Sequence, residues 1–100
     1  MTVVVFNTAY EHDGLIFEHV TYNAPDIQSI GGMVQTMLLA ATSLGLGSLW
    51  ICDVLCAYPT IRQWLGRKEE MVTAVSLGYA DESPSPRPRT PAAELTEWRS

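Results

Sequence analysis

Residues 26–53 read DIQSIGGMVQTMLLAATSLGLGSLWICD, and this stretch decides the fold. Its apolar residues recur at intervals of three and four, so they share one face of a predicted helix. These residues are Ile27, Ile30, Val34, Met37, Leu38, Ala41 and Leu44. Gly45 and Gly47 predict the end of this helix, because glycine readily takes the left-handed conformation found at helix ends. Residues 48–52 are apolar and predict a short buried strand directly after the turn.

The start of this helix carries the expected signals. Asn23 can cap it, Pro25 suits its first turn, and Asp26 faces the positive end of the helix dipole. The helix beyond Asp26 has no charged residue and is apolar nearly all round, which predicts burial by its own domain or by a partner subunit. Gly31 and Gly32 fit either tolerated flexibility or the close approach of another backbone or a flat ligand.

Three further segments complete the body of the chain. Residues 2–6, TVVVF, and residues 71–77, MVTAVSL, predict buried strands, because β-branched and apolar residues fill them. A strand buried on both faces needs two neighbours, so we expect part of the sheet to come from another chain. Residues 53–66 predict a short helix with Pro59 in its first turn and Gly66 at its end.

The segment between the first strand and the long helix, residues 7–24, is polar and predicts irregular structure. Asp13 and Gly14 form a turn signal within it. His12 and His19 invite a catalytic interpretation, but histidines in a polar loop are usually solvated, and we expect that here.

The C-terminal part of the chain has a different composition. Four of the six prolines fall within residues 84–91, PSPRPRTP, which predicts an extended backbone because proline fixes φ and lacks a donor. Residues 92–98 resume a helical pattern, with Leu95 and Trp98 on one side. An aromatic anchor after an extended segment favours a docked arm over a disordered tail.

Composition limits the function classes. One hundred residues form at most one domain, and an apolar fraction of 47% excludes a disordered chain. The net charge of −5 argues against a nucleic-acid partner, and no apolar run reaches the roughly 18 residues of a membrane span. Cys52 and Cys56 lack further ligands for a metal site, so we expect reduced thiols in the cytoplasm. No nucleophile–base pair, P-loop or GxGxxG signature is present, so a bound cofactor must carry any chemistry.

Three pieces of the chain occur in an order and spacing that resemble a known family. The run QTMLLAATSLGLGSLWICD, a short helix ending in WLG, and AVSLGYADESPSPRPRTP are similar to the C-terminal half of the FMN-dependent nitroreductases. The resemblance covers essentially the whole chain and implies an α+β, nitroreductase-like partial domain with a long central helix on a small sheet. We expect residues 1–83 to form this half-domain and residues 84–100 to form an extended arm that docks on a partner subunit.

The resemblance also implies an FMN site. In the family, basic residues of the arm contact the FMN phosphate, and the matching residues of this chain are Arg87 and Arg89. In the family, backbone N–H groups after the strand reach N5 and O4 of the flavin ring. The residues that match this segment are Trp50, Ile51, Cys52 and Asp53. Without the resemblance, we would interpret the two arginines as ordinary charged residues that aid solubility. We would interpret the side chains of Trp50 and Ile51 as ordinary residues of the hydrophobic core. Many members have two glycines where this chain has Cys52 and Asp53, and a carboxylate there would disfavour flavin reduction.

The implied function is that of an FMN-dependent NAD(P)H oxidoreductase. In the family, hydride passes through flavin N5 to a nitroaromatic, a quinone or a related acceptor, within a homodimer. The arginine- and serine-rich motif that family members carry near their N-terminus has no counterpart here. We therefore expect this chain to hold about half of a flavin site, completed by a second copy or by a chain that supplies the N-terminal half. The alternative is a flavin-free dimerisation module or an inactive remnant.

Overall fold

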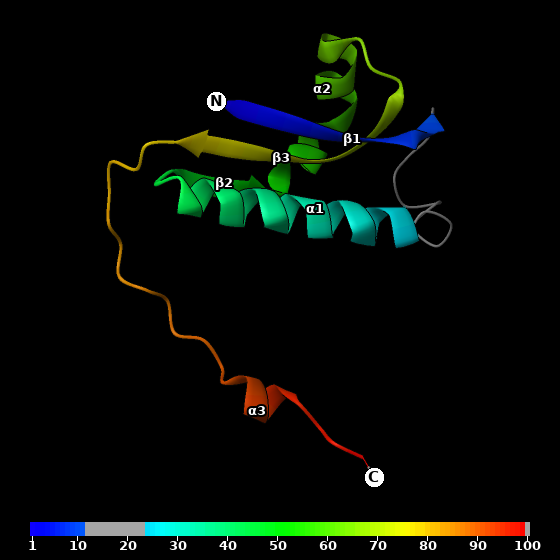
Figure 1. Cartoon of the computed structure of the whole chain (residues 1–100). Helices are drawn as coiled ribbons and strands as arrows, with labels where there is room; N and C mark the ends of the chain where they lie inside the picture. Colours follow the sequence, from blue (N-terminus) through cyan, green and yellow to red (C-terminus); the bar gives the residue numbers. More distant parts are fainter. Residues whose placement is uncertain (12–23, 100) are drawn as a thin grey trace.

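A three-stranded antiparallel sheet lies at the centre of the structure, with a helix on each of its faces (Figure 1). The computed structural model describes residues 1–11 and 24–99. The strand order is β1-β3-β2, so β3 (Glu69–Gly78) lies between β1 (Thr2–Glu11) and β2 (Gly47–Ile51). The fold of the described residues is therefore α+β, as the sequence predicts.

The central strand β3 is buried because both of its neighbours pair with it and apolar residues face both sides of the sheet. Met71, Ala74 and Val75 are each at most 2% exposed. In the register, Val5 of β1 lies opposite Thr73, and Trp50 of β2 lies opposite Val75. The strand predicted over residues 71–77 is confirmed and extends beyond both ends of that range.

The first strand, β1, is an edge strand within the described residues. It pairs with β3 on one side, and among the described strands none covers its other side. Val5 is buried, but Val4, which points to the opposite face, is only half-buried. The described residues therefore do not bury residues 2–6 on both faces by themselves, and the neighbouring strand expected from another chain stays a prediction. Residues 7–11, predicted as irregular, continue the strand.

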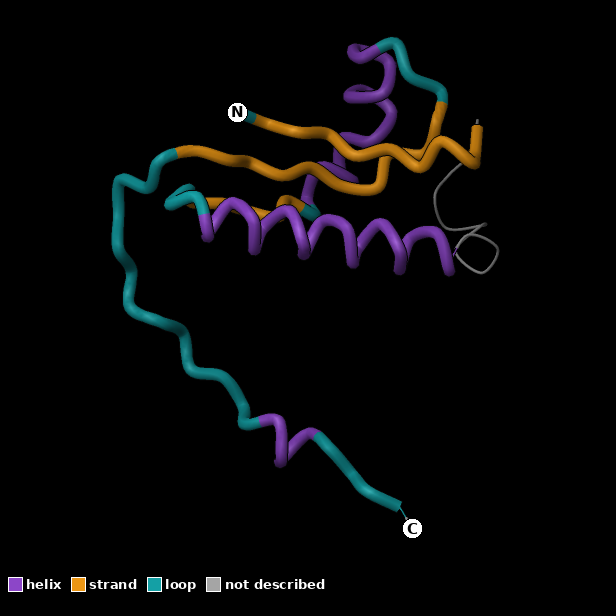
Figure 2. Tube along the Cα trace, viewed as in Figure 1, coloured by secondary structure: helices purple, strands orange, loops and turns teal. Residues whose placement is uncertain are grey.

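The long helix α1 (Ala24–Ser43) has 20 residues and packs along one face of the sheet (Figure 2). Its fully buried Val34 joins Val5 and Val75 in the core, and around them pack the partly buried Val3, Ile30, Met37, Leu38, Trp50 and Leu77. The helix stops at the predicted place, because Gly45 takes a φ of 73°. Gly47, predicted as part of the stop, instead begins β2.

The outward face of α1 is apolar and exposed. Met33 is 45% exposed, Leu39 is 62% exposed, and a side chain built on Gly32 would meet nothing within 4 Å among the described residues. Burial all round the helix is therefore not found in this part of the chain. The central position of the helix stays a prediction, because only its inward face meets the sheet.

The connection after β2 turns at once into helix. The 3-10 helix η2 (Asp53–Ala57) leads directly into α2 (Tyr58–Leu65), which lies on the face of the sheet opposite α1 (Figure 1). Pro59 lies in the first turn of α2, and Gly66, with a φ of 64°, caps its end, as predicted. The buried Tyr58 anchors the helix, since its hydroxyl accepts a hydrogen bond of 3.3 Å from the β3 backbone.

The arm, defined here as residues 84–99, runs away from the sheet and both large helices (Figure 1). All of its residues are exposed. Its helix α3 (Ala92–Leu95) is a single turn, whereas the sequence predicts helix through residue 98. The turn ends because Thr96 is extended, and one helical turn without tertiary packing is unstable in water. Docking of the arm on a partner stays a prediction.

Some sequence features lie outside the described residues. These are the turn at Asp13 and Gly14, the histidines His12 and His19, and the cap Asn23. Across the described ranges, no helix has both the length and the hydropathy needed to cross a bilayer.

Candidate functional site

The residues predicted to face a flavin ring form one continuous segment at the end of β2. Trp50 and Ile51 are the last residues of the strand, Cys52 is the link, and Asp53 opens η2. Trp50 and Ile51 are half-buried, whereas Cys52 and Asp53 are exposed. The segment therefore presents a backbone that is fixed by the sheet at one end and accessible at the other.

The side chain of Trp50 belongs to the core beneath α1. A side chain on Gly31 of α1 would come within 3.8 Å of the Trp50 ring. The indole Nε1–H donates a hydrogen bond of 2.8 Å to the Thr73 hydroxyl. The flat group that approaches Gly31 is thus a tryptophan of the same chain, and 3.8 Å is ordinary contact, so the glycine is tolerated rather than required.

The backbone after Ile51 offers hydrogen-bond donors. In η2 the first N–H with a helical acceptor is that of Leu55, which donates to the Cys52 carbonyl at 3.1 Å. The N–H groups of Asp53 and Val54 precede it, and no acceptor for them is found among the described residues. These two donors next to an exposed surface can bind a ligand that carries acceptor atoms.

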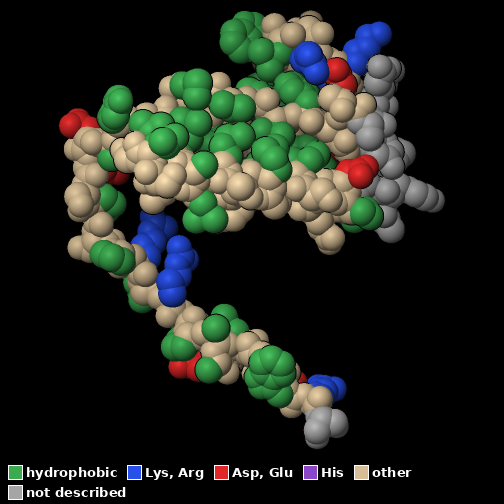
Figure 3. Space-filling view, viewed as in Figure 1, with side chains coloured by type: hydrophobic (Ala, Val, Ile, Leu, Met, Phe, Trp, Pro, Cys, Tyr) green, Lys and Arg blue, Asp and Glu red, His purple; other side chains and the backbone are tan. Residues whose placement is uncertain are grey.

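The two predicted phosphate-binding arginines, Arg87 and Arg89, lie elsewhere. Both are on the arm and exposed, and neither makes an ion pair or hydrogen bond with a described residue. Figure 3 shows basic side chains partway along the arm, below the main mass of the molecule in this view. The described structure does not bring these arginines together with residues 50–53.

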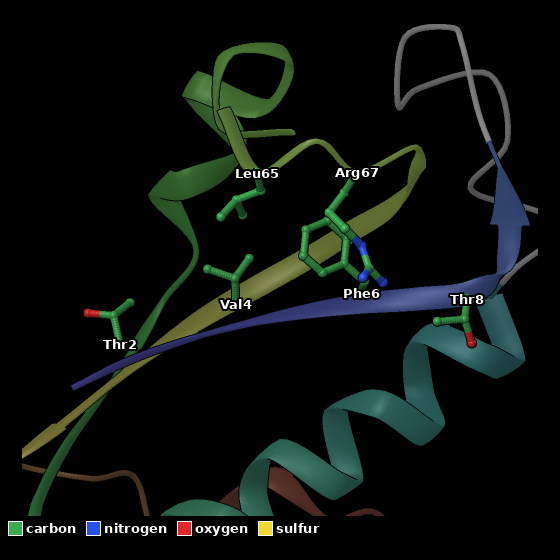
Figure 4. A pocket seen from close by; sticks show the side chains of 6 residues that line it. All are labelled: Thr2, Val4, Phe6, Thr8, Leu65 and Arg67. Carbon is green, nitrogen blue, oxygen red and sulfur yellow. The ribbon is translucent and has the colours of Figure 1, made fainter. Parts of the chain in front are cut away.

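A groove between β1 and α2 was not predicted from the sequence. It is lined by Thr2, Val4, Phe6, Thr8, Leu65 and Arg67 (Figure 4). The Arg67 guanidinium lies 5.1 Å from the centre of the Phe6 ring and pairs with Glu69 at 2.8 Å. The groove combines an apolar floor with one cation, and its described lining contains no general base that could activate the hydroxyls of Thr2 and Thr8.

The Glu69 carboxylate beside this groove is held in its charged form. Hydrogen bonds from its own backbone N–H and from that of Lys68, together with the Arg67 guanidinium, keep the pKa of Glu69 below its ordinary value of 4.5. The effect outweighs desolvation, which acts in the opposite direction. This ion pair joins the end of α2 to the start of β3.

Sequence reasoning also missed Thr73. It is 2% exposed, accepts the Trp50 indole hydrogen bond, and donates to the Ile51 carbonyl at 2.9 Å. The available signal was a threonine within the apolar run MVTAVSL, since a buried hydroxyl needs partners. Elsewhere in the described ranges, no cluster of His, Cys, Asp and Glu could hold a metal ion, and Cys52 and Cys56 are free thiols.

Comparison with known proteins gives two findings. The model of the Nitroreductase family matches residues 1–79. The NADPH-flavin oxidoreductase of Vibrio harveyi is 30% identical over 96 aligned residues, which cover 89% of this chain and 40% of that protein. The chain thus spans less than half the length of this curated relative.

Proposed function

This chain belongs to the nitroreductase family, and we propose that it forms part of an FMN-dependent NAD(P)H oxidoreductase. The relative from Vibrio harveyi bears the name NADPH-flavin oxidoreductase, which supports a flavin as cofactor and NADPH as a hydride source. In this proposal residues 1–83 are the C-terminal half-domain of the enzyme. Residues 84–100 are the arm, which docks on a partner subunit.

The observation that carries the proposal is the pair of backbone donors after β2. The N–H groups of Asp53 and Val54 have no acceptor among the described residues and adjoin the exposed Cys52. A flavin ring has acceptors along one edge, at N5 and O4, so the donor set of this segment fits the ring. Donors fixed by a strand end need little reorganisation to bind negative charge as it develops.

The roles of the side chains follow from this placement. Trp50 and Ile51 fix the segment from within the core, so that the two backbone donors that follow Cys52 meet the ring. Arg87 and Arg89 stand on a proline-stiffened backbone, and their planar guanidinium groups suit a phosphate. In this proposal the arm brings them to the FMN phosphate within a homodimer, or in a complex with a chain that supplies the N-terminal half.

When bound, FMN supplies hydride transfer at N5, from NAD(P)H to a nitroaromatic, a quinone or a related small acceptor. The protein holds the ring edge, orients it, and keeps its phosphate in place. The free thiols of Cys52 and Cys56 are compatible with the cytoplasm, which is the location we propose.

The test is direct, because bound FMN is yellow. We expect the purified full chain to absorb in the near-ultraviolet and blue, and to bind added FMN in a fluorescence titration. A colourless protein that leaves FMN fluorescence unchanged throughout the titration would refute flavin binding by this chain.

A second candidate is a flavin-free dimerisation module, such as an inactive remnant of a nitroreductase. It is favoured by the exposed apolar face of α1, with Leu39 62% exposed, and by the edge of β1 that no described strand covers. Light scattering on the flavin-free chain tests it. A dimer without FMN supports this candidate, and a well-behaved monomer contradicts it.

A further inference from the structure

The buried hydroxyl of Thr73 connects two strands through side-chain hydrogen bonds. It accepts one from the Trp50 indole at 2.8 Å and donates its own proton to the Ile51 carbonyl at 2.9 Å. Thr73 is only 2% exposed, so water does not compete for these bonds. Its proton is committed to Ile51, since the alternative acceptor, the Ala74 carbonyl, is 3.5 Å away.

The place of this hydroxyl in the sheet gives it a specific effect. The β2–β3 pairing ends at Ile51 opposite Ala74, so the next residue of β3, Thr73, has no strand partner on β2. Its side chain therefore continues the hydrogen bonding between β3 and β2 beyond the last backbone pair. By holding the Ile51 carbonyl, it fixes the plane of the peptide that joins Ile51 to Cys52.

The Trp50 ring restrains the backbone just before the same peptide. Its Nε1 is tied to Thr73, while its far edge lies against α1 at Gly31 and packs on the core around Val34 and Val75. Trp50 is therefore held at both ends of its side chain. Little freedom remains for the backbone that leads to the N–H groups of Asp53 and Val54, which have no acceptor among the described residues.

We infer that Thr73 is a positioning residue for the flavin site: its hydroxyl sets the direction of the donors that follow Ile51. This inference rests on the proposed function, because it assumes that those donors face FMN. Thr73 itself touches no cofactor. Its effect passes through the Ile51 carbonyl and the Trp50 indole.

The first measurement needs no flavin. Of the three tryptophans, Trp64 and Trp98 are 81% and 91% exposed, so a slowly exchanging indole proton in an NMR spectrum reports Trp50. In Thr73→Val, which keeps the shape and removes the hydroxyl, we expect this indole proton to exchange at least about tenfold faster and the amide resonances of Cys52 and Asp53 to shift. Thr73→Ser keeps the hydroxyl and should stay within about twofold of the wild type.

The second measurement is titration of the full-length variants with FMN. We expect Thr73→Val to bind about tenfold more weakly and Thr73→Ser to bind as the wild type does. Val5→Ala is the control, because it weakens the same core without touching the Ile51–Cys52 peptide. It should lower the melting temperature and leave FMN affinity unchanged. If Thr73→Val does not fold, Thr73→Cys replaces it, because a thiol is a poor hydrogen-bond partner.

The possible outcomes distinguish the positioning role of Thr73 from the proposed function. If the wild type binds FMN and Thr73→Val binds it equally well, with unchanged exchange of the Trp50 indole proton and unshifted amide resonances of Cys52 and Asp53, the positioning role is wrong and the proposed function stands. If the wild type binds no FMN, the proposed function fails and the positioning role fails with it. If Val5→Ala weakened FMN binding as much as Thr73→Val does, the loss would be a general effect of core stability. This result would also overturn the inference.

Discussion

The body of the chain, residues 1–83, and the arm, residues 84–99, obtain their order in opposite ways. In the body, order comes from packing: Val34 and Val75 are fully buried, and β3 is paired on both sides. In the arm, order comes from the proline backbone, and every residue is exposed. The proposed flavin contacts are divided between these two regions.

This difference separates two kinds of binding group. The donors after Ile51 are placed by the fold, because the sheet, Trp50 and Thr73 hold the backbone that carries them. Arg87 and Arg89 are placed by whatever the arm docks on. The ring half of the proposed site is therefore preorganised in this chain, whereas the phosphate half depends on assembly.

The largest effect tests whether stability resides in the body alone. We expect Met71→Ala, at a position 2% exposed, to lower the free energy of unfolding by about 2–5 kcal/mol. In the monomer, at protein concentrations too low for the arm to dock on a partner, Trp98→Ala, at a position 91% exposed, should change it by less than about 0.5 kcal/mol. Urea unfolding followed by circular dichroism measures both, and a large loss in Trp98→Ala would show that the arm is docked in solution.

The next effect concerns the phosphate half of the site. Replacing both Arg87 and Arg89 by alanine should weaken FMN binding about tenfold to a hundredfold, because charge-assisted hydrogen bonds are lost. Binding of riboflavin, which has no phosphate, should be unchanged, as should the unfolding free energy. Arg99→Ala is the control for the loss of positive charge on the arm. An equal loss of riboflavin binding would contradict a phosphate role.

A smaller effect is expected in the ring half. Asp53→Asn removes a negative charge next to the proposed ring position and should raise the reduction potential of bound FMN. Unit charges a few ångströms apart in water interact by about 1 kcal/mol, which is about 20 mV for a two-electron couple. Spectroelectrochemical titration measures the shift, and Asp81→Asn, beyond the end of β3, is the control. An unchanged potential in Asp53→Asn would place the carboxylate away from the ring.

Local signals predicted most of the body. The spacing of apolar residues located α1, and Gly45 and Gly66 located helix ends, because their positive φ angles follow from local backbone sterics. The strands were found with errors at their ends, such as Gly47, which belongs to β2. Helix and strand identity is largely encoded locally, whereas exact boundaries also depend on pairing with distant residues.

Long-range features were harder to predict. Thr73 is unremarkable within an apolar run until the sheet sets its hydroxyl between Trp50 and the Ile51 carbonyl. The groove with Arg67 likewise exists only because α2 returns over β1. Residues 50–53 could be singled out from the sequence through a family resemblance, and their position together with Arg87 and Arg89 remains a prediction about an assembly.

The smallest effect compares two ion pairs with the same spacing in the sequence. Arg67–Glu69 in the body has side chains 43% and 24% exposed, and Arg99–Glu97 in the arm has side chains 83% and 73% exposed. The pKa of Glu69 lies below 4.5, mainly through hydrogen bonds to its carboxylate, so its ionised form stabilises the folded chain above that pH. This contribution is lost as the pH falls through the lowered pKa.

Thermal melts at a series of pH values therefore distinguish the two pairs. Glu69→Gln should lower the melting temperature at neutral pH, and the difference from the wild type should shrink as the pH falls from 4.5 through the lowered pKa of the folded chain. Glu97→Gln should follow the wild type at every pH, because an ion pair exposed on both sides contributes little. If Glu97→Gln showed the larger dependence on pH, the arm would have to be packed in solution, and the contrast between a packed body and a free arm would fail.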